Sequence, residues 1–574
     1  MIKINGKEYS VPKNSTVLEA ARYAGINIPT LCYLKDINEI GACRLCLVEV
    51  KGARGLVTAC VYPVNEGMEI FTNTPKVMAA RKMNLELVLS AHDKKCLSCV
   101  RSTTCELQKL CNEYGVDSSY FNSPALEEDI EDNGPSIVRD NNKCILCRRC
   151  VAACTKLQGI GAIGIVNRGY DTKVAPAFEV NLTDTSCINC GQCIVACPVG
   201  ALYEKDDTQK VLDAIADPSK HVVICSAPSI RATIGECFGY EPGTDVEGKM
   251  ITAMKALGFD YVYDMNFTAD LTIMEEAHEF IERFTKGENL PLMTSCSPGW
   301  IKYCEHYFPE MVDNLSSCKS PQQMFGAMYK TYYAQKHGLD PKDIYMVSCI
   351  PCTAKKFEVL RDDQSAAGVP DVDVAITTRE LARMIQQAGI DFCALEDGKF
   401  DDPFGIGSGA GVIFGATGGV MEAALRTAAE VILGKPLEKL EFEDVRGTAG
   451  IKRASYKLGD IQINVAVVSG TNNAKELLNR VRSGEEKVDF IEVMACPGGC
   501  VNGGGQPVQP AIVRNNVDLR AKRAACLYSA DKKMDLRKSH ENSAIKKIYE
   551  EFLGEPGSHK AHEILHTTYV KRGL

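Results

Sequence analysis

The sequence predicts a multidomain protein of mixed class, with small α+β domains in the first 209 residues and a larger α/β domain after them. Two observations predict this division. Sixteen of the 27 cysteines fall in the first 200 residues, and fifteen of these form four closely spaced groups. From about residue 210 onward, apolar runs alternate with amphipathic stretches, which is typical of a largely parallel sheet covered by helices. A chain of 574 residues is long enough for two to four domains with separate cores.

Composition and charge narrow the class of protein. A net charge of −9 argues against nucleic-acid binding. The first residues, Met1–Gly6, lack an apolar signal core, and no stretch reaches the roughly 18 apolar residues that a membrane span needs. Many cysteines in a chain without a signal peptide indicate metal ligands rather than disulfides. We therefore expect a cytoplasmic protein with no membrane partner.

Residues 1–78 are expected to form a β-grasp, ferredoxin-like domain that holds a 2Fe–2S cluster. Asn5-Gly6 predicts a hairpin turn, and Thr16 with Glu19 predicts a capping box that opens the helix Val17–Tyr23. The candidate ligands, spaced C-x10-C-x2-C-x13-C, are Cys32, Cys43, Cys46 and Cys60. Plant-type ferredoxins have a shorter first gap. This spacing resembles instead the 2Fe–2S module of complex I large subunits and related dehydrogenases, and zinc is the alternative occupant.

Residues 79–126 are expected to hold a 4Fe–4S cluster through one histidine and three cysteines. The group reads His92-x3-Cys96-x2-Cys99-x5-Cys105. An imidazole can replace one thiolate of such a cluster, although a zinc site is again the alternative. Its position directly after a 2Fe–2S module repeats the dehydrogenase arrangement.

Residues 127–209 are expected to form a two-cluster, bacterial ferredoxin-like domain. The first run, C-x2-C-x2-C-x3-C, consists of Cys144, Cys147, Cys150 and Cys154, and the second, which ends in proline, consists of Cys187, Cys190, Cys193 and Cys197. In such ferredoxins the fourth cysteine of each run ligates the other cluster. We therefore assign Cys197 to the first cluster and Cys154 to the second, which makes three accessory 4Fe–4S clusters in all.

Residues 210–574 carry three motifs within the predicted α/β domain. Strands are expected around Val222–Ile224, Tyr261–Tyr263 and Ile344–Val347, and helices near 268–285, 320–337 and 378–388. The motifs are Thr294–Trp300 (Thr-Ser-Cys-Ser-Pro-Gly-Trp), Pro351–Glu358 and Glu492–Pro507. With these motifs in order behind the cysteine groups, the chain resembles an iron–iron (FeFe) hydrogenase of the long, multi-cluster clostridial type over essentially its whole length.

The resemblance implies an active-site cofactor, the H-cluster, and residues that would hold it. The H-cluster is a 4Fe–4S cluster joined through a cysteine sulfur to a two-iron centre that carries CO, cyanide and a bridging azadithiolate. Cys352, Cys496 and Cys500 are the implied ligands, with Cys500 as the bridge. Lys355 is implied to donate a hydrogen bond to a cyanide, as an ammonium suits an anionic ligand. The implied pocket lining is Pro228, Ser229, Gln322, Phe414, Gly415 and Met494.

The first motif departs from the family pattern, which usually has two adjacent cysteines, a proton relay followed by a cluster ligand. Here the pair is Cys296-Ser297. Aligned without gaps, Cys296 takes the relay position and Ser297 takes the ligand position. Serine is the poorer iron ligand because its hydroxyl is hard to deprotonate. The fourth ligand is therefore left open between Ser297, Cys296 and a thiol elsewhere, for which Cys318 is preferred over Cys225 and Cys349.

A proton path is predicted on one helix. Glu276, Glu279 and Arg283 recur at i, i+3 and i+7, which places them on one helical face. Proton transfer needs acid–base groups at hydrogen-bond spacing. The resemblance implies that these residues are relay residues, with Ser316 between the two glutamates and Cys296 at the metal end. On spacing alone, the less favoured alternative is a solvated charged face.

The expected function is that of an enzyme, a hydrogenase that interconverts H2 with two protons and two electrons. Electrons would pass through the accessory clusters to or from ferredoxin or another soluble redox carrier. Dedicated maturation proteins and, in some assemblies, NADH-oxidising subunits are the further expected partners. The alternatives are an electron-transfer subunit of an NADH-linked complex, and a hydrogen sensor or cluster-assembly factor on the same fold.

Overall fold

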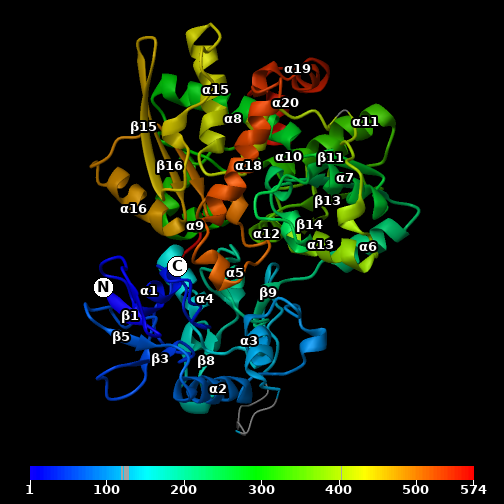
Figure 1. The fold of residues 1–574 in the computed structure, drawn as a ribbon. Coiled ribbons are helices and arrows are strands. Elements are labelled where there is room, and N and C mark those ends of the chain that lie inside the picture. Colours follow the sequence, from blue (N-terminus) through cyan, green and yellow to red (C-terminus); the bar gives the residue numbers. More distant parts are fainter. Residues whose placement is uncertain (118–120, 122–127, 403, 574) are drawn as a thin grey trace.

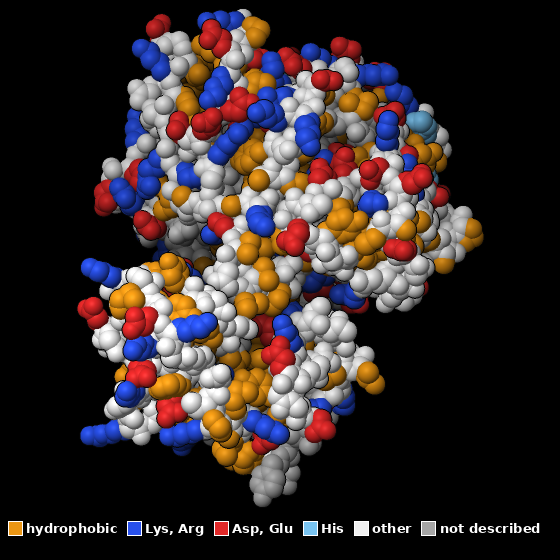
Figure 2. Space-filling model, viewed as in Figure 1, with side chains coloured by type: hydrophobic (Ala, Val, Ile, Leu, Met, Phe, Trp, Pro, Cys, Tyr) orange, Lys and Arg blue, Asp and Glu red, His pale blue; other side chains and the backbone are white. Residues whose placement is uncertain are grey.

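The computed structural model describes residues 1–117, 121, 128–402 and 404–573, which form two lobes (Figure 1). The N-terminal lobe carries the four cysteine groups, and the larger lobe carries two sheets with helices around them. On the face shown in Figure 2, acidic and basic side chains are interspersed over the larger lobe, and apolar side chains gather where the lobes meet. The predicted boundary between residues 126 and 127 lies outside the described residues. Within the described part, no helix is both long and apolar enough to cross a bilayer.

The N-terminal domain is a five-stranded sheet with one helix packed on it. Its strands, in the spatial order β2-β1-β5-β3-β4, are β1 (Ile2–Ile4), β2 (Lys7–Tyr9), β3 (Leu47–Val50), β4 (Val57–Thr58) and β5 (Glu69–Phe71). Asn5 and Gly6 form the predicted tight turn, with φ of 48° and 83° and with Ile4 opposite Lys7. Helix α1 (Val17–Tyr23) begins with the predicted Thr16–Glu19 capping box. Both local predictions are confirmed.

The rest of this lobe consists of short elements that frame the cysteine loops. Two longer helices, α2 (Pro75–Ser90) and α3 (Glu106–Tyr114), flank the His92 group. The short elements are β6 (Ile137–Arg139), α4 (Arg149–Ala152), β7 (Gly164–Val166), β8 (Lys173–Ala175), α5 (Gln192–Ala196) and β9 (Leu202–Glu204). Strand β6 pairs with β9, and β7 pairs with β8, both antiparallel. Each C-x2-C-x2-C run thus leads into a short helix, α4 or α5.

The larger lobe contains the predicted parallel sheet, in the order β11-β10-β13-β14. Its strands are β10 (His221–Ser226), β11 (Tyr261–Asp264), β13 (Ile344–Cys349) and β14 (Val374–Ile376). The helices around it are α6 (Thr208–Ala216), α7 (Glu247–Ala256), α8 (Asn266–Lys286), α10 (Pro321–Met328), α11 (Ala334–His337), α12 (Ala354–Glu358) and α13 (Thr378–Gln387). All three predicted strands and all three predicted helical stretches are present, the middle stretch with a π-helical turn at Tyr329–Tyr333.

A second sheet, in the order β12-β17-β16-β15, was not predicted. It consists of β12 (Leu292–Met293), β15 (Ile451–Leu458), β16 (Ile461–Ser469) and β17 (Phe490–Met494). Strand β12 has only two residues and pairs with β17 from a distant part of the chain, so no local pattern announces the pairing. Helices α9 (Pro298–Tyr307), α14 (Gly409–Ile413), α15 (Gly419–Leu433) and α16 (Thr471–Arg482) complete this half.

The C-terminal segment wraps the larger lobe. Its helices are α17 (Ala511–Arg514), α18 (Leu519–Lys533), α19 (Ser543–Ile548) and α20 (His559–Leu565). Helix α18 packs against α14, and α20 packs against α10. After α20 the chain pairs with a loop before α10, because Lys319 N–H donates to Leu565 O and Thr567 N–H donates to Ser317 O, both at 2.8 Å.

The carboxyl ends of parallel strands from both sheets converge on one region. Strand β10 leads to Ala227, β11 to Met265, β13 to Ile350 and β17 to Ala495. Ligands of α/β proteins bind beyond the carboxyl ends of such strands. The three motifs of the larger lobe therefore meet at the edge where a binding site is expected.

Buried ion pairs join the two lobes. Glu204 on β9 accepts hydrogen bonds from Arg379 at 2.7 Å and from Arg383 at 2.9 Å, both on α13. Burial opposes ionisation of Glu204, but the two guanidinium groups outweigh it and lower its pKa to about 2. Removing either partner of a buried pair leaves an uncompensated charge, so these contacts fix the geometry between the lobes.

Candidate active site and cluster-binding cavities

Two buried cavities in the N-terminal lobe are each lined by four cysteines. The first is lined by Cys144, Cys147, Cys150 and Cys197. The second is lined by Cys154, Cys187, Cys190 and Cys193. The fourth cysteine of each run thus lies with the first three cysteines of the other run. This is the crossed arrangement of two-cluster ferredoxins.

Backbone N–H groups point at these thiols, as they do where sulfur carries negative charge. Leu146 N–H donates to Cys144 Sγ at 3.5 Å. Leu146 and the residue at the matching position of the second run, Asn189, both have left-handed φ, of 52° and 57°. Backbone N–H groups around Cys154 and Cys197 likewise oppose the rise in thiol pKa that burial causes. Thiol sets held by such donors fit iron–sulfur clusters.

The first cysteine group also converges. These thiols lie close enough to shift one another's pKa: Cys43 and Cys60 lower the pKa of Cys32, and Cys32 and Cys46 raise that of Cys60. Three of these four thiols are buried in the domain core, and Cys43 is half-buried. Four thiols crowded together under a covering sheet fit a small cluster.

His92 is oriented as a metal ligand would be. Its Nδ1 lies 3.0 Å from the carbonyl oxygen of Lys143, which leaves Nε2 available. Burial lowers its pKa, which favours the neutral imidazole that metals bind. The three cysteines of the group, Cys96, Cys99 and Cys105, are half-buried. The thiol of Cys99 packs directly on Gly200, where an added Cβ would lie 2.5 Å from its sulfur.

The larger lobe holds a cavity at the carboxyl ends of the strands. All six predicted lining residues, Pro228, Ser229, Gln322, Phe414, Gly415 and Met494, line it, together with Cys296, Lys355 and Cys500. Most of the lining is apolar, so water is largely excluded. The amide oxygen of Gln322 is buried and has no hydrogen-bond partner among the described residues. A cavity with an unsatisfied amide, a lysine and two thiols fits a polar, sulfur-bound cofactor.

Cys352, Cys496 and Cys500 meet beside this cavity. Burial raises the pKa of all three thiols, and Cys352 raises the pKa of both Cys496 and Cys500 further because the groups are close. Buried, crowded thiols resist deprotonation, and a bound metal is what stabilises them as thiolates. The loop after Cys500 touches the N-terminal lobe. A Cβ on Gly504 would lie 2.2 Å from the carbonyl oxygen of Cys190, so only glycine permits this approach.

Lys355 is fixed at the cavity by a buried carboxylate. Its ammonium donates to Glu358 Oε2 at 2.8 Å, and Gln322 Nε2 donates to the same oxygen at 2.9 Å. The hydroxyl of Ser320 donates to it as well, at 2.8 Å. The ammonium is thus held in an apolar cavity with donors left over for an anionic ligand.

The residues of the Cys296-Ser297 pair face different surroundings. Cys296 lines the cavity with Cys500, and burial followed by the nearby Glu276 carboxyl raises its pKa well above the ordinary value. Cys296 is therefore a neutral thiol that can donate a proton. Ser297 lies at the start of α9, where its hydroxyl accepts a hydrogen bond from Ala495 N–H at 3.2 Å. Ala495 is the residue before Cys496, so the hydroxyl lies close to the backbone of that cysteine.

Cys318 lies away from the three clustered thiols. Its sulfur donates to Glu279 Oε2 at 3.8 Å, and the carboxylates that act on its pKa are Glu279, Glu276 and Glu275. The thiol of Cys318 thus points into the acidic network, and this geometry does not favour the preference for Cys318 as fourth ligand. Cys225 and Cys349 lie on the neighbouring strands β10 and β13, paired with Ser348 and Ser226, and are core residues.

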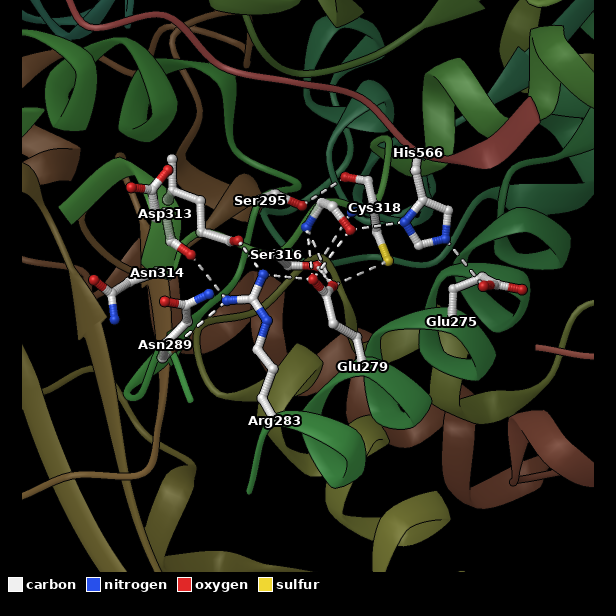
Figure 3. A network of polar contacts seen from close by, with 12 residues as sticks. Glu275, Glu279, Arg283, Asn289, Ser295, Asp313, Asn314, Ser316, Cys318 and His566 are labelled. Carbon is white, nitrogen blue, oxygen red and sulfur yellow. Dashed lines mark hydrogen bonds and ion pairs between the residues drawn. The ribbon is translucent and has the colours of Figure 1, made fainter. Parts of the chain in front are cut away.

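Three residues of the predicted proton path, Arg283, Glu279 and Ser316, form a hydrogen-bonded network at α8 (Figure 3). Arg283 Nη2 donates to Glu279 Oε1 at 2.6 Å, and Ser316 Oγ donates to Glu279 Oε2 at 2.8 Å. Arg283 also donates to the carbonyl oxygens of Asp313 and Leu315. Arg283 and Glu279 are partly exposed, at 16% and 12%, so this end reaches solvent.

Glu276 lies on the same helix but is not hydrogen-bonded to this network. Burial and, after it, the negative charge of Glu279 raise its pKa to about 8. Neither carboxyl oxygen of Glu276 has a hydrogen-bond partner among the described residues. At neutral pH Glu276 is therefore a carboxylic acid that can donate a proton toward Cys296. The contacts thus link the partly exposed Arg283 and Glu279 to Ser316, and Glu276 lies near enough to Cys296 for its carboxyl to raise the pKa of that thiol.

Comparison with known proteins decides the family. Residues 220–504 match the family described as "Iron only hydrogenase large subunit, C-terminal domain", and residues 517–572 match "Iron hydrogenase small subunit". The chain is 49% identical to NADP-reducing hydrogenase subunit HndD of Solidesulfovibrio fructosivorans, over 100% of this chain and 99% of the relative. It is 46% identical to iron hydrogenase 1 of Clostridium pasteurianum, over 99% and 100%.

The chain belongs to the iron-only (FeFe) hydrogenase family. The solved structure of apo [FeFe]-hydrogenase HydA1 from Chlamydomonas reinhardtii matches 64% of this chain and 100% of that chain, with a TM-score of 0.57 and 43% identity. The N-terminal lobe matches a 2Fe–2S cluster-binding domain over 1–75, the iron–sulfur region of NADH-ubiquinone oxidoreductase G over 81–119, and a 4Fe–4S dicluster domain over 143–201. The protein is therefore a hydrogenase with accessory iron–sulfur domains, and the predicted fold class is confirmed.

Sequence reasoning missed part of the polar network of this hydrogenase. The Ser317 hydroxyl donates to Glu279 Oε1 at 3.0 Å, and its oxygen lies 2.7 Å from His566 Nδ1. His566 pairs in turn with Glu275 (Figure 3). Glu275 and Ser317 are sequence neighbours of predicted relay residues, which was the one available signal. His566 comes from the C-terminal segment, and no local pattern indicates its contact with a residue 249 positions away.

Proposed function

We propose that Cys352, Cys496, Cys500 and Ser297 hold the 4Fe–4S part of the H-cluster, with Cys500 bridging to a two-iron centre in the cavity. The support is the meeting of three thiols beside an apolar cavity with Lys355 at its wall. Ser297 is preferred as the fourth ligand because its hydroxyl lies beside the Ala495-Cys496 backbone, whereas Cys296 faces Glu276. When bound, the H-cluster supplies the two-electron chemistry that makes and breaks H2.

The protein's own residues prepare the cavity for this chemistry. The apolar wall of Pro228, Phe414 and Met494 excludes water, which strengthens every electrostatic contact inside. Lys355, held by Glu358, offers its remaining N–H groups to an anionic ligand of the two-iron centre. Cys296 would pass protons between Glu276 and the cavity, with Ser316 and Glu279 continuing the relay towards solvent and Arg283 holding the Glu279 carboxylate in place.

We also propose that four accessory clusters carry electrons through the N-terminal lobe. The ligand groups would be Cys32, Cys43, Cys46 and Cys60 for a 2Fe–2S cluster; His92, Cys96, Cys99 and Cys105 for a 4Fe–4S cluster; and the two crossed sets for two more 4Fe–4S clusters. The family matches over 1–75, 81–119 and 143–201 support domains over 1–78, 79–126 and 127–209, followed by the catalytic domain over 210–574.

The route from the lobe to the active site is short. Cys190 lines the second ferredoxin-like cavity. Its thiol lies close enough to Cys496 for Cys496 to raise its pKa. The backbone of Gly504 touches that of Cys190 and Gly191. Electrons would therefore leave the cluster of Cys154, Cys187, Cys190 and Cys193 for the 4Fe–4S part of the H-cluster.

We propose ferredoxin or a similar carrier as the redox partner, with maturation proteins needed to install the two-iron centre, in a cytoplasmic setting. A second candidate is a hydrogenase subunit of a nicotinamide-linked complex. The full-length likeness to a relative named an NADP-reducing hydrogenase subunit favours it. The two readings differ in whether the chain alone exchanges electrons with ferredoxin.

Iron analysis tests the proposed cluster set. Fully matured protein should contain about 20 irons per chain, namely one 2Fe–2S cluster, three accessory 4Fe–4S clusters and the six-iron H-cluster. Replacing Cys187 with alanine should remove about four irons without affecting the H-cluster signals. A content of about half that number, or zinc in a whole-number ratio to the chain, would refute the assignment.

A further inference from the structure

The outer end of the relay has a chemical gap. Arg283 contacts Glu279, but a guanidinium stays protonated at any ordinary pH and therefore does not hand protons over. A group that both gains and loses a proton near neutral pH is needed beside Glu279. Histidine is the side chain with that property.

His566 lies one hydroxyl away from Glu279 (Figure 3). Ser317 Oγ donates to Glu279 Oε1 at 3.0 Å, and the same oxygen lies 2.7 Å from His566 Nδ1. The backbone of His566 pairs with that of Cys318, so the C-terminal segment holds the ring in place. Both contacts are within the range of well-formed hydrogen bonds.

The far side of His566 is held by a buried carboxylate. Its Nε2 lies 3.0 Å from Glu275 Oε2, which also accepts from Gly557 N–H at 2.9 Å, while Tyr549 O–H donates to Glu275 Oε1. Burial opposes the ionisation of Glu275, but the hydrogen bonds from His566 and Tyr549 outweigh it and lower its pKa. Glu275 is therefore an anion, and Nε2 of His566 keeps its proton as the donor.

Counting protons shows what the ring can do. Ser317 has one hydroxyl proton. When Nδ1 of His566 is protonated, Nδ1 donates to the Ser317 oxygen, and the Ser317 hydroxyl donates to Glu279. When Nδ1 is bare, it accepts the Ser317 proton instead, and Glu279 loses one donor. The direction of the Ser317 hydroxyl is thus linked to the charge of His566.

We propose that His566 is a relay residue that exchanges one proton with Glu279 through the Ser317 hydroxyl. The proton on Nδ1 moves to Ser317 Oγ while the hydroxyl proton moves to Glu279 Oε1. The imidazolium becomes a neutral ring with its proton on Nε2, the carboxylate becomes an acid, and no electron moves. This inference rests on the proton relay proposed above and adds the group that loads it.

The surroundings of His566 suit this role. The titratable groups that face it are Glu275 and Glu279 on α8, Tyr549, Cys318 and His562 on α20. The exposed ring of His562 packs on His566, with ring centroids 4.1 Å apart, and also faces Glu282.

Replacing His566 with glutamine tests the proposal. Glutamine can still hydrogen-bond to Ser317 but cannot carry a proton, so hydrogen evolution should fall about tenfold and lose its pH dependence between about pH 5 and 8. Ser317→Ala should cause the same loss, and the double variant should lose no more than either single variant. His540→Gln is the matched control, because this C-terminal histidine contacts Thr427 and Glu430 instead.

A spectroscopic readout separates proton exchange from a merely structural role. In infrared difference spectra of the holoenzyme between pH 5 and 8, a carboxylate band should shift as the imidazolium is lost, because Ser317 turns away from Glu279. The shift should vanish in both His566→Gln and Glu279→Gln. A wild-type pH profile in His566→Gln, with Glu279→Gln inactive, would overturn this inference alone. A fully active Glu279→Gln would overturn the relay itself.

Discussion

Glu279→Gln should lose hydrogen turnover by on the order of 10²-fold or more while keeping its clusters. The carboxylate of Glu279 is the junction of the network, with Arg283, Ser316 and Ser317 donating to it. An amide preserves the shape but cannot gain and lose a proton. Steady-state hydrogen evolution from a reduced dye, together with infrared bands of metal-bound CO and cyanide, measures both quantities.

The matched control is Glu282→Gln on the same helix. Glu282 is exposed and pairs with Lys286 at 2.5 Å, outside the relay. Its turnover should stay close to that of the wild type, since an exposed ion pair contributes little. Wild-type turnover in Glu279→Gln with intact infrared bands would mean that protons reach the cavity by another route.

Cys296→Ala should abolish turnover yet leave the 4Fe–4S part of the H-cluster assembled. The thiol is the last proton-carrying group between Glu276 and the cavity, and alanine carries none. The expected loss is again on the order of 10²-fold or more. Electron paramagnetic resonance of the reduced protein reports whether the cluster remains.

Ser297→Ala provides the opposite pattern. If the Ser297 oxygen completes the ligand set, this variant should assemble the 4Fe–4S part poorly, and Ser297→Cys should restore it, because a thiolate is the better iron ligand. Loss of the cluster in Cys296→Ala, with an intact cluster in Ser297→Ala, would make Cys296 the ligand instead.

Local sequence patterns predicted the features of the fold that depend on neighbouring residues. The Asn5-Gly6 turn and the Thr16–Glu19 capping box depend on neighbouring residues, and both are present. The crossed placement of Cys154 and Cys197 was predicted because the C-x2-C-x2-C-x3-C runs match the signature of two-cluster bacterial ferredoxins. The six cavity residues came from the family resemblance and not from any pattern in the sequence.

What could not be predicted depends on contacts between distant segments. Strand β12 gains its place only by pairing with β17, about 200 residues later. Cys318 was a reasonable thiol candidate by its neighbours in the chain, but its direction is set by Glu279 on α8. His566 reaches the relay only because the C-terminal tail pairs with the loop around Cys318. Tertiary pairing of this kind leaves no periodic signal in the sequence.

Hydrogen evolution by the matured chain alone is the most direct test of the central claim. With reduced ferredoxin as donor, and reduced methyl viologen as the reference donor, the account predicts sustained H2 production from both. Production from viologen but not from ferredoxin would favour the nicotinamide-linked complex. Absence of H2 from both donors, in protein that shows the infrared bands of bound CO and cyanide, would contradict the account.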